Sequence, residues 1–175
     1  MSYIVELGDP VLRQKAEPVD DVFSSETQAI IEQMKEALDA KQGIGIAAPQ
    51  VGKSKQMFIV APNQTLVSPY DNIDKGLIVI NPSITFNSEQ FTTEWEGCLS
   101  IPGIRGLVPR QCDITITYTN CHGEIREEQY KDFIARIFLH EYDHLLGMVF
   151  LDRISNIKDN VITDGYYMSL TEDDE

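Results

Sequence analysis

Residues 140–144 read His-Glu-x-x-His, a spacing that can hold a metal ion. On a helix, side chains four positions apart lie on the same face, one turn above the other. His140 and His144 could therefore bind one ion, and Glu141 could reach a water molecule on it. The chain has only 3 histidines, and two of them stand at this spacing. We therefore favour a metal site over two helix histidines with unrelated roles.

The third ligand decides which chemistry follows, because catalytic zinc sites use three protein ligands and leave one position for water. In zincin-like proteases that ligand comes after the histidines. Downstream of Gly147 the chain has no histidine, and Asp152, Asp159 and Asp164 are candidates without a supporting motif.

Three cysteines lie upstream of the histidines. Cys112 and Cys121 flank a predicted strand and His122 follows in a turn, so we expect ordinary strand and turn residues there. A structural metal site from these three is the alternative, although their spacing matches no common zinc finger. Cys98 lies in EGCLS at 96–100, where the glycine permits a tight backbone. Taken alone, Cys98 is equally a ligand or a small buried side chain.

Length and composition indicate a single domain over residues 1–175. The net charge of -14 makes nucleic acid and anionic membrane surfaces poor partners. An odd number of cysteines argues against a disulfide framework and fits a reducing compartment. No signal peptide or membrane-spanning run is evident. We expect a soluble, cytoplasmic protein, with an organellar protein that lost its transit peptide as the alternative.

The hydrophobic pattern predicts a helix, then strands, then a second helix, an order typical of the α+β class. The first helix begins at Ser24 or Ser25, with Gln28 as a capping-box partner, and ends near Gln42. Strands are expected at 57–60, 77–80, 91–95, 114–118 and 124–130, the last two as a hairpin, with a loop over 62–76. Asn81-Pro82 is expected to end the second strand.

The second predicted helix carries the histidines. Asp132 is expected to cap it, and Gly147 is its natural stop. The side chains expected to share one face of this helix are those of Phe133, Ile137, His140 and His144.

Residues 43–48, GIGIAA, match the dinucleotide-binding pattern G-x-G-x-x-G/A letter for letter. That pattern needs a strand before it and a helix after it. Here a helix precedes the segment, and Pro49 and Gly52 follow closely. We expect instead that the glycines let the backbone approach another group closely.

Together, GIGIAAPQ at 43–50, EGCLS at 96–100 and HEYDH at 140–144 resemble the three signature motifs of the peptide deformylase family, in order. The similarity runs from about residue 3 to about residue 154, nearly the whole predicted core. Further similar positions are Gly8 to Arg13, Ile101, Pro102, Arg105, Val108 to Arg110, Leu145 and Gly147.

The resemblance implies a role for each motif residue. One catalytic metal ion, with water in its fourth position, would be bound by Cys98, His140 and His144. Glu141 would act as general base and then as general acid. The Gln50 side chain and the Leu99 backbone N–H would stabilise the oxyanion.

The resemblance also implies the substrate and the metal. Family members remove the formyl group from the N-terminal formylmethionine of newly made polypeptides and release formate. Fe(II) is the usual ion, and Zn(II) or Ni(II) replaces it in preparations. The implied fold is α+β, with antiparallel β-sheets around a central metal-binding helix and an N-terminal helix. Substrate-binding positions implied by the resemblance, each of which could equally be plain core or surface, are Ile44, Gly45, Gly97, Arg105, Phe133 and Ile137.

Three departures from the family pattern stand out. Leu139 replaces the usual glutamine before the first histidine, and Gly103 replaces a larger polar residue. Residues 155–175, beyond the core at 1–154, form a divergent segment with an acidic tail at 171–175. The basic C-terminal helix that aids ribosome docking in many members is not evident. The alternatives to a deformylase are a zincin-like protease and a noncatalytic relative that binds metal or formyl-peptides.

Overall fold

Two antiparallel sheets and the helix between them build the molecule, which we describe from a computed structural model covering residues 3–63 and 70–172. The predicted α+β class is confirmed. The middle of the predicted loop, 64–69, and the end of the acidic tail, 173–175, lie outside the described residues. The helices are α1 (Ser25–Lys41), α2 (Asp132–Leu145), α3 (Ile157–Asn160) and α4 (Asp164–Glu172). Short 3-10 helices span Pro10–Arg13, Ala48–Val51, Ile73–Lys75 and Phe150–Arg153.

Helix α1 begins where the sequence predicts. The Ser24 hydroxyl accepts a hydrogen bond from the N–H of Thr27 at 3.1 Å. The expected capping box with Gln28 does not form, because the Gln28 amide donates instead to the carbonyl of Val22 at 2.7 Å. The helix ends at Lys41. The apolar face of α1 buries Ile30, Ile31, Met34, Ala37 and Leu38.

The larger sheet has the order β1-β2-β4-β7-β8, with β3 paired to β4. Its strands are β1 (Gly45–Ala47), β2 (Met57–Val60), β3 (Asp71–Asn72), β4 (Gly76–Asn87), β7 (Asp113–Thr119) and β8 (Ile125–Lys131). The predicted end of the second strand at Asn81-Pro82 is wrong, because β4 continues to Asn87. The register shifts between Ile80 and Ser83, and this irregularity accommodates a proline that cannot donate a ladder hydrogen bond.

The smaller sheet has the order β5-β6-β9, built from β5 (Phe91–Cys98), β6 (Ile101–Gln111) and β9 (Val161–Thr163). The strand expected at 91–95 is confirmed and extends to Cys98. Strand β6 was not predicted, since Pro102, Gly103 and Pro109 interrupt its pattern. Gly103 has a φ of +77°, a conformation that favours glycine. The backbone conformation therefore explains why a glycine stands here in place of a larger polar residue.

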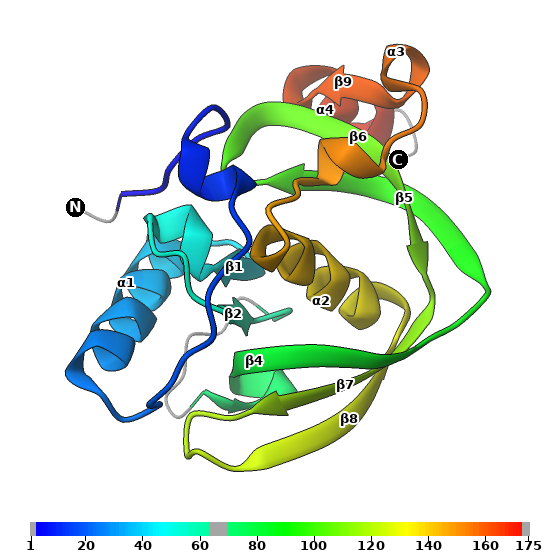
Figure 1. Cartoon of the computed structure of the whole chain (residues 1–175). Coiled ribbons are helices and arrows are strands. Elements are labelled where there is room, and N and C mark those ends of the chain that lie inside the picture. The colour runs from blue at the N-terminus through cyan, green and yellow to red at the C-terminus, as the bar shows by residue number, and fades with distance from the viewer. Residues whose placement is uncertain (1–2, 64–69, 173–175) are drawn as a thin grey trace.

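Helix α2 lies between the two sheets and contacts strands of both (Figure 1). Phe138 is fully buried and packs edge-to-face on Phe58, with ring centroids 5.8 Å apart, and stacks on Tyr130 at 4.3 Å. The prediction that Asp132 caps this helix is wrong. Lys131 occupies the N-cap, without a side-chain hydrogen bond, and Asp132 is the first helical residue. The hydrophobic contacts around Phe138 therefore fix α2 more firmly than its first turn does.

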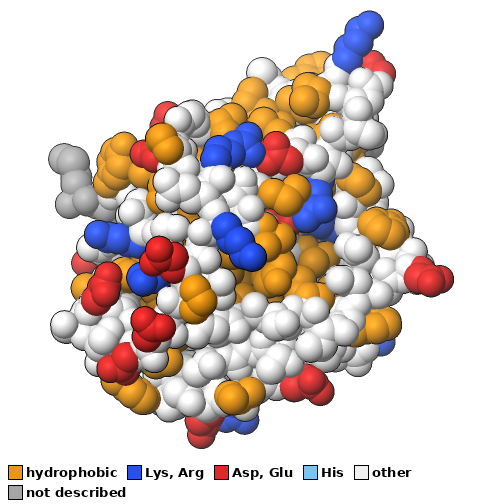
Figure 2. Space-filling view, in the orientation of Figure 1, with side chains coloured by type: hydrophobic (Ala, Val, Ile, Leu, Met, Phe, Trp, Pro, Cys, Tyr) orange, Lys and Arg blue, Asp and Glu red, His pale blue; other side chains and the backbone are white. Residues whose placement is uncertain are grey.

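Acidic side chains are spread around the face shown in Figure 2, whereas hydrophobic side chains gather in a hollow near its centre. None of the helices that the structure describes is both long enough and apolar enough to cross a membrane.

Candidate metal centre

Cys98, His140 and His144 come together where the end of β5 meets α2. Their ligand atoms all lie within 4.8 Å of one another, and 3.4 Å separates the Cys98 Sγ from the His144 Nε2. About 3.6 Å would separate a sulfur and a nitrogen bound to one tetrahedral zinc ion. Within 3–63 and 70–172 no other three such side chains are grouped this way. The thiol and the two imidazoles therefore fit one metal ion.

The alternative ligands lie elsewhere. Asp152 accepts a hydrogen bond from Arg13 at 2.5 Å, and Asp164 accepts one from Arg105 at 2.8 Å. The group of ligand atoms does not include Asp159 either. Cys112 and Cys121 are free cysteines outside the group, the first buried and the second half-buried. Among the candidates for the third ligand, Cys98 is thus the one whose ligand atom lies with those of His140 and His144.

Glu141 is buried beside this group. Burial raises the pKa of its carboxyl to about 7, against the opposing charge of His140. One carboxylate oxygen, Oε2, has no hydrogen-bond partner among the described residues, and neither does the Nδ1 of His144. A Cβ added at Gly45 would overlap the other oxygen, Oε1. The close approach that we expected at Gly45 is therefore made by the glutamate side chain, whose Oε2 stays buried without a partner among the described residues.

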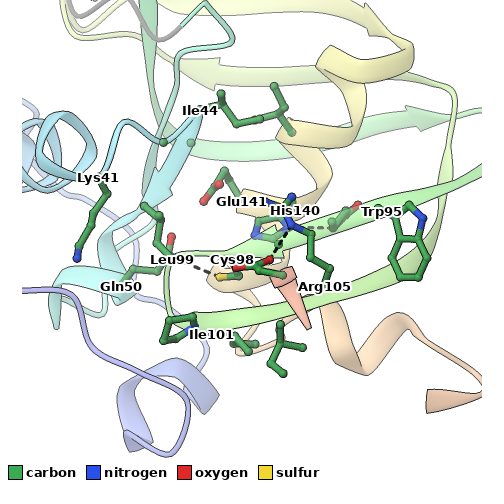
Figure 3. A pocket seen from close by; sticks show the side chains of 18 of the residues that line it. Lys41, Ile44, Gln50, Trp95, Cys98, Leu99, Ile101, Arg105, His140 and Glu141 are labelled. Carbon is green, nitrogen blue, oxygen red and sulfur yellow. Dashed lines mark hydrogen bonds and ion pairs between the residues drawn. The ribbon is translucent and has the colours of Figure 1, made fainter. Parts of the chain in front are cut away.

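Gln50 also faces the metal ligands. Its side-chain oxygen accepts the N–H of Ala47 at 2.8 Å, which sets the orientation of the amide. The amide nitrogen then points to the Sγ of Cys98 at 3.5 Å and the hydroxyl of Ser100 at 3.2 Å. Figure 3 shows Gln50 directed at Cys98, with Leu99 beside it. An N–H donor is thus held next to the thiol.

His140 is oriented by Glu96, a residue whose contacts the sequence did not reveal. The Nδ1 of His140 donates to the Glu96 carboxylate at 2.9 Å, which leaves its Nε2 as the ligand atom. The same carboxylate accepts two hydrogen bonds from Arg110, at 2.9 and 3.0 Å, and one from Arg136 at 2.8 Å. Burial opposes the charge, but the hydrogen bonds from Arg110 and His140 hold the pKa of Glu96 well below its usual range.

The buried charges continue to Asp143, which stands inside the HEYDH motif. Asp143 accepts from Arg110 at 2.6 Å and from Arg153 at 2.6 and 3.1 Å. These ion pairs tie α2 to β6 and to the chain that follows α2. In the sequence, the only indication of the part played by Arg110 was its place among the positions similar to the family.

A cavity of about 620 Å³ opens beside the metal ligands (Figure 3). Its walls include every residue expected at the substrate site: Ile44, Gly45, Gly97, Arg105, Phe133 and Ile137. Phe133 is 51% exposed at the rim, whereas Ile137 is buried. Wall residues that the sequence did not single out for the substrate site include Lys41, Trp95, Arg136, Asp164 and Tyr167.

A thiol and two imidazoles at ligand distance, with a buried carboxyl beside them, define a metal-dependent hydrolase. The model of the polypeptide deformylase family matches residues 1–160 of the chain. The chain therefore belongs to the peptide deformylase family. Its members are metal-dependent hydrolases that remove the formyl group from the N-terminal methionine of nascent peptides, so the resemblance drawn from the three motifs is confirmed.

Individual members of the family are similar to this chain over nearly their full length. Peptide deformylase 2 of Nostoc sp. is 42% identical over 168 residues, covering 95% of this chain and 93% of the relative. The crystal structure of peptide deformylase from Thermotoga maritima is 37% identical with a TM-score of 0.80, covering 89% of this chain and 99% of that one. A Met-Ala-Ser-bound class I type b peptide deformylase from Acinetobacter baumannii is 34% identical with a TM-score of 0.77, covering 88% and 100%.

Proposed function

We propose that the chain performs the deformylation of its family with one divalent metal ion held by Cys98, His140 and His144. The observation that carries this proposal is the convergence of three ligand atoms beside a buried glutamate. A thiolate with two imidazoles suits iron, zinc and nickel. By the resemblance to the family, we propose Fe(II) in the cell, with Zn(II) or Ni(II) bound in preparations.

When bound, such an ion supplies Lewis acidity and makes water nucleophilic near neutral pH. Glu141 takes a proton from the attacking water and delivers it to the departing amine of methionine. Burial raises the pKa of Glu141 above its ordinary value, which supports a carboxyl that can hold a proton as well as take one. Water attacks the formyl carbon, the C–N bond breaks, and formate and a free amino group result.

Negative charge grows on the formyl oxygen during the attack. The amide N–H of Gln50 and the backbone N–H of Leu99 donate to that oxygen. The hydrogen bond from Ala47 supports this role for Gln50, because it keeps the amide nitrogen directed at Cys98. Loss of one such donor costs about 10²–10³ in rate.

Methionine enters the cavity beside the ligands. Ile44, Phe133 and Ile137 supply apolar contacts for its side chain, and the backbone at Gly45 and Gly97 leaves room for the peptide. The Met-Ala-Ser-bound relative supports a peptide that begins with methionine as the ligand. Arg105 contacts the part of the peptide that follows.

We propose a single catalytic domain over 1–175 that acts on nascent peptides in the cytoplasm, with an organellar location as the alternative. Its three free cysteines suit a reducing compartment. Ribosome docking through a basic C-terminal helix is not part of the proposal. Helix α4 has no lysine or arginine, so we do not propose electrostatic docking through it.

Formate release from formyl-Met-Ala by the metal-loaded protein tests the proposal. We expect turnover in the native chain, and loss of both metal and turnover in Cys98→Ala. Cys121→Ala is the matched control, since its half-buried thiol lies outside the ligand group and should change neither.

Three outcomes would contradict the proposal. Metal retention by Cys98→Ala would exclude this thiol as a ligand. Digestion of an unblocked protein would favour a zincin-like protease. Binding of formyl-Met-Ala without formate release would favour a noncatalytic relative.

A further inference from the structure

Ser100 carries a fully buried hydroxyl next to the metal ligands. It stands with Leu99 in the two-residue turn that joins β5 to β6, and Cys98 pairs with Ile101 across that turn. The Oγ of Ser100 accepts a hydrogen bond from the Nε2 of Gln50 at 3.2 Å, although the two residues stand 50 positions apart in the chain. The deformylation proposed above gives Ser100 no part.

This hydrogen bond fixes the plane of the Gln50 amide. The amide oxygen accepts the N–H of Ala47 at 2.8 Å, and that contact alone leaves the amide free to turn about the line between the two atoms. Ser100 accepts one of the two protons on the amide nitrogen and so supplies a second fixed point. The other proton is left on the side of the metal ligands, where the Sγ of Cys98 lies 3.5 Å from the same nitrogen.

Both residues are closed off from water and held from the backbone. Gln50 is 1% exposed and Ser100 is 0% exposed, so water cannot replace the hydroxyl as a partner for the amide. The N–H of Val5 donates to the backbone carbonyl of Gln50 at 2.9 Å, and the N–H of Leu7 donates to that of Ser100 at 2.8 Å. The N-terminal segment therefore holds the two residues in place relative to each other.

We propose that Ser100 is a positioning residue for deformylation, which holds the Gln50 amide so that one N–H faces the formyl oxygen. The inference deepens the proposed deformylase function and rests on it. A donor stabilises the growing charge only when it is aimed at the position of that charge, and a misplacement of about 1 Å can cost about 10²-fold in rate. Without the hydroxyl, the amide gains rotational freedom and spends less time in the productive orientation.

A double-mutant cycle tests this role. Formate release from formyl-Met-Ala is measured on the metal-loaded native protein, on Ser100→Ala, on Gln50→Ala and on the double variant. We expect Ser100→Ala to lower kcat about 10-fold and to change KM less than about twofold. Gln50→Ala should lower kcat about 10²–10³-fold. In the Gln50→Ala background, Ser100→Ala should cost nothing further, because Ser100 acts through the amide alone.

Thr27→Val is the matched control. It removes the hydroxyl of a buried residue at the start of α1, where that hydroxyl is hydrogen-bonded to Ser24 and to the carbonyl of Asp21. This variant should leave kcat, KM and metal content unchanged. Metal content is measured on every variant, and Ser100→Ala should bind as much metal as the native protein does.

Nuclear magnetic resonance gives a second measurement that needs no turnover. In the zinc-loaded, isotope-labelled protein, the side-chain amide signal of Gln50 is identified by its loss in Gln50→Ala. We expect Ser100→Ala to shift this signal and to speed the exchange of its protons with water, since the amide loses a buried acceptor.

A native kcat in Ser100→Ala would overturn the positioning role. An equal loss of kcat in the native and Gln50→Ala backgrounds, or loss of metal from Ser100→Ala, would overturn it too, because either result indicates a general structural role. An amide signal unaffected by Ser100→Ala would do the same. In these cases formate release by the native protein would leave the proposed function standing. Absence of formate release from the metal-loaded native protein would overturn both.

Discussion

Replacement of Glu96 by glutamine removes one negative charge from the buried network behind the metal ligands and keeps the shape of the side chain. In the native protein that carboxylate accepts from Arg110, Arg136 and His140, all at 2.8 to 3.0 Å. After the change, Asp143 is the remaining buried carboxylate in contact with Arg110. The one ion pair left to Arg136 among the described residues is with the exposed Glu94 at 3.6 Å, beside its hydrogen bonds to Val108 and Thr92.

The expected cost follows from burial. The side chains of Glu96, Arg110 and Arg136 are 5%, 4% and 5% exposed, so each of the two cations loses one of its two carboxylate partners where water cannot replace it. Breaking a buried ion pair from one side costs about 3–5 kcal/mol. A domain of this size has a free energy of unfolding of about 5–15 kcal/mol, so the substitution should remove a large share of that stability. His140 also exchanges a charged carboxylate for a neutral amide at its Nδ1, which should weaken metal binding about 10–100-fold.

Glu94→Gln is the matched control. Glu94 lies two residues away on β5 and pairs with the same Arg136, but its side chain is 55% exposed. A surface pair of this kind contributes about 0–1 kcal/mol. Urea unfolding with and without metal, together with competition against a chelator, would measure both quantities. Similar unfolding free energies and metal affinities in the two variants would refute the reasoning.

Gly45→Ala should lower formate release about 10²-fold through displacement of Glu141, while Gly165→Ala, which meets no atom within 4 Å, should leave the rate unchanged. Tyr118 and Tyr130 should stay protonated above pH 10 in the folded state, because burial and a shared carboxylate raise the pKa of both. Their stabilising effect is complete below pH 10, the ordinary tyrosine pKa, and declines above it, so tyrosinate absorbance should rise with alkaline unfolding. Removal of the metal by a chelator should abolish turnover. It should also lower the free energy of unfolding, by about 2.7 kcal/mol relative to protein kept with free metal at 100 times its Kd.

The sequence predicted the elements whose signals are local. The apolar repeat and Ser24 placed α1, and the His-Glu-x-x-His spacing placed the ligands on one face of α2. Cys98 could not be chosen from its own surroundings, since a free cysteine is as often buried core. Its assignment needed the three motifs together, and the structure then brings the thiol to the imidazoles.

Features that depend on long-range pairing were missed. Strand β6 carries Pro102 and Pro109, which read as breaks, and only its pairing with β5 over most of its length makes it a strand. Strand β9 is three residues long, so its place beside Arg105 is set by β6 rather than by its own pattern. Nor does a sequence show which arginines are buried, because burial follows from the packing of distant segments.

Glu141→Gln tests the central claim most directly, since it removes the proton carrier and leaves the ligands in place. Metal content and formate release would be measured on the same anaerobic preparation. We expect one metal ion per chain, as in the native protein, and a turnover lowered by about 10²–10⁴. Near-native formate release from the metal-loaded variant would contradict the role of Glu141, and with it the mechanism proposed for the site.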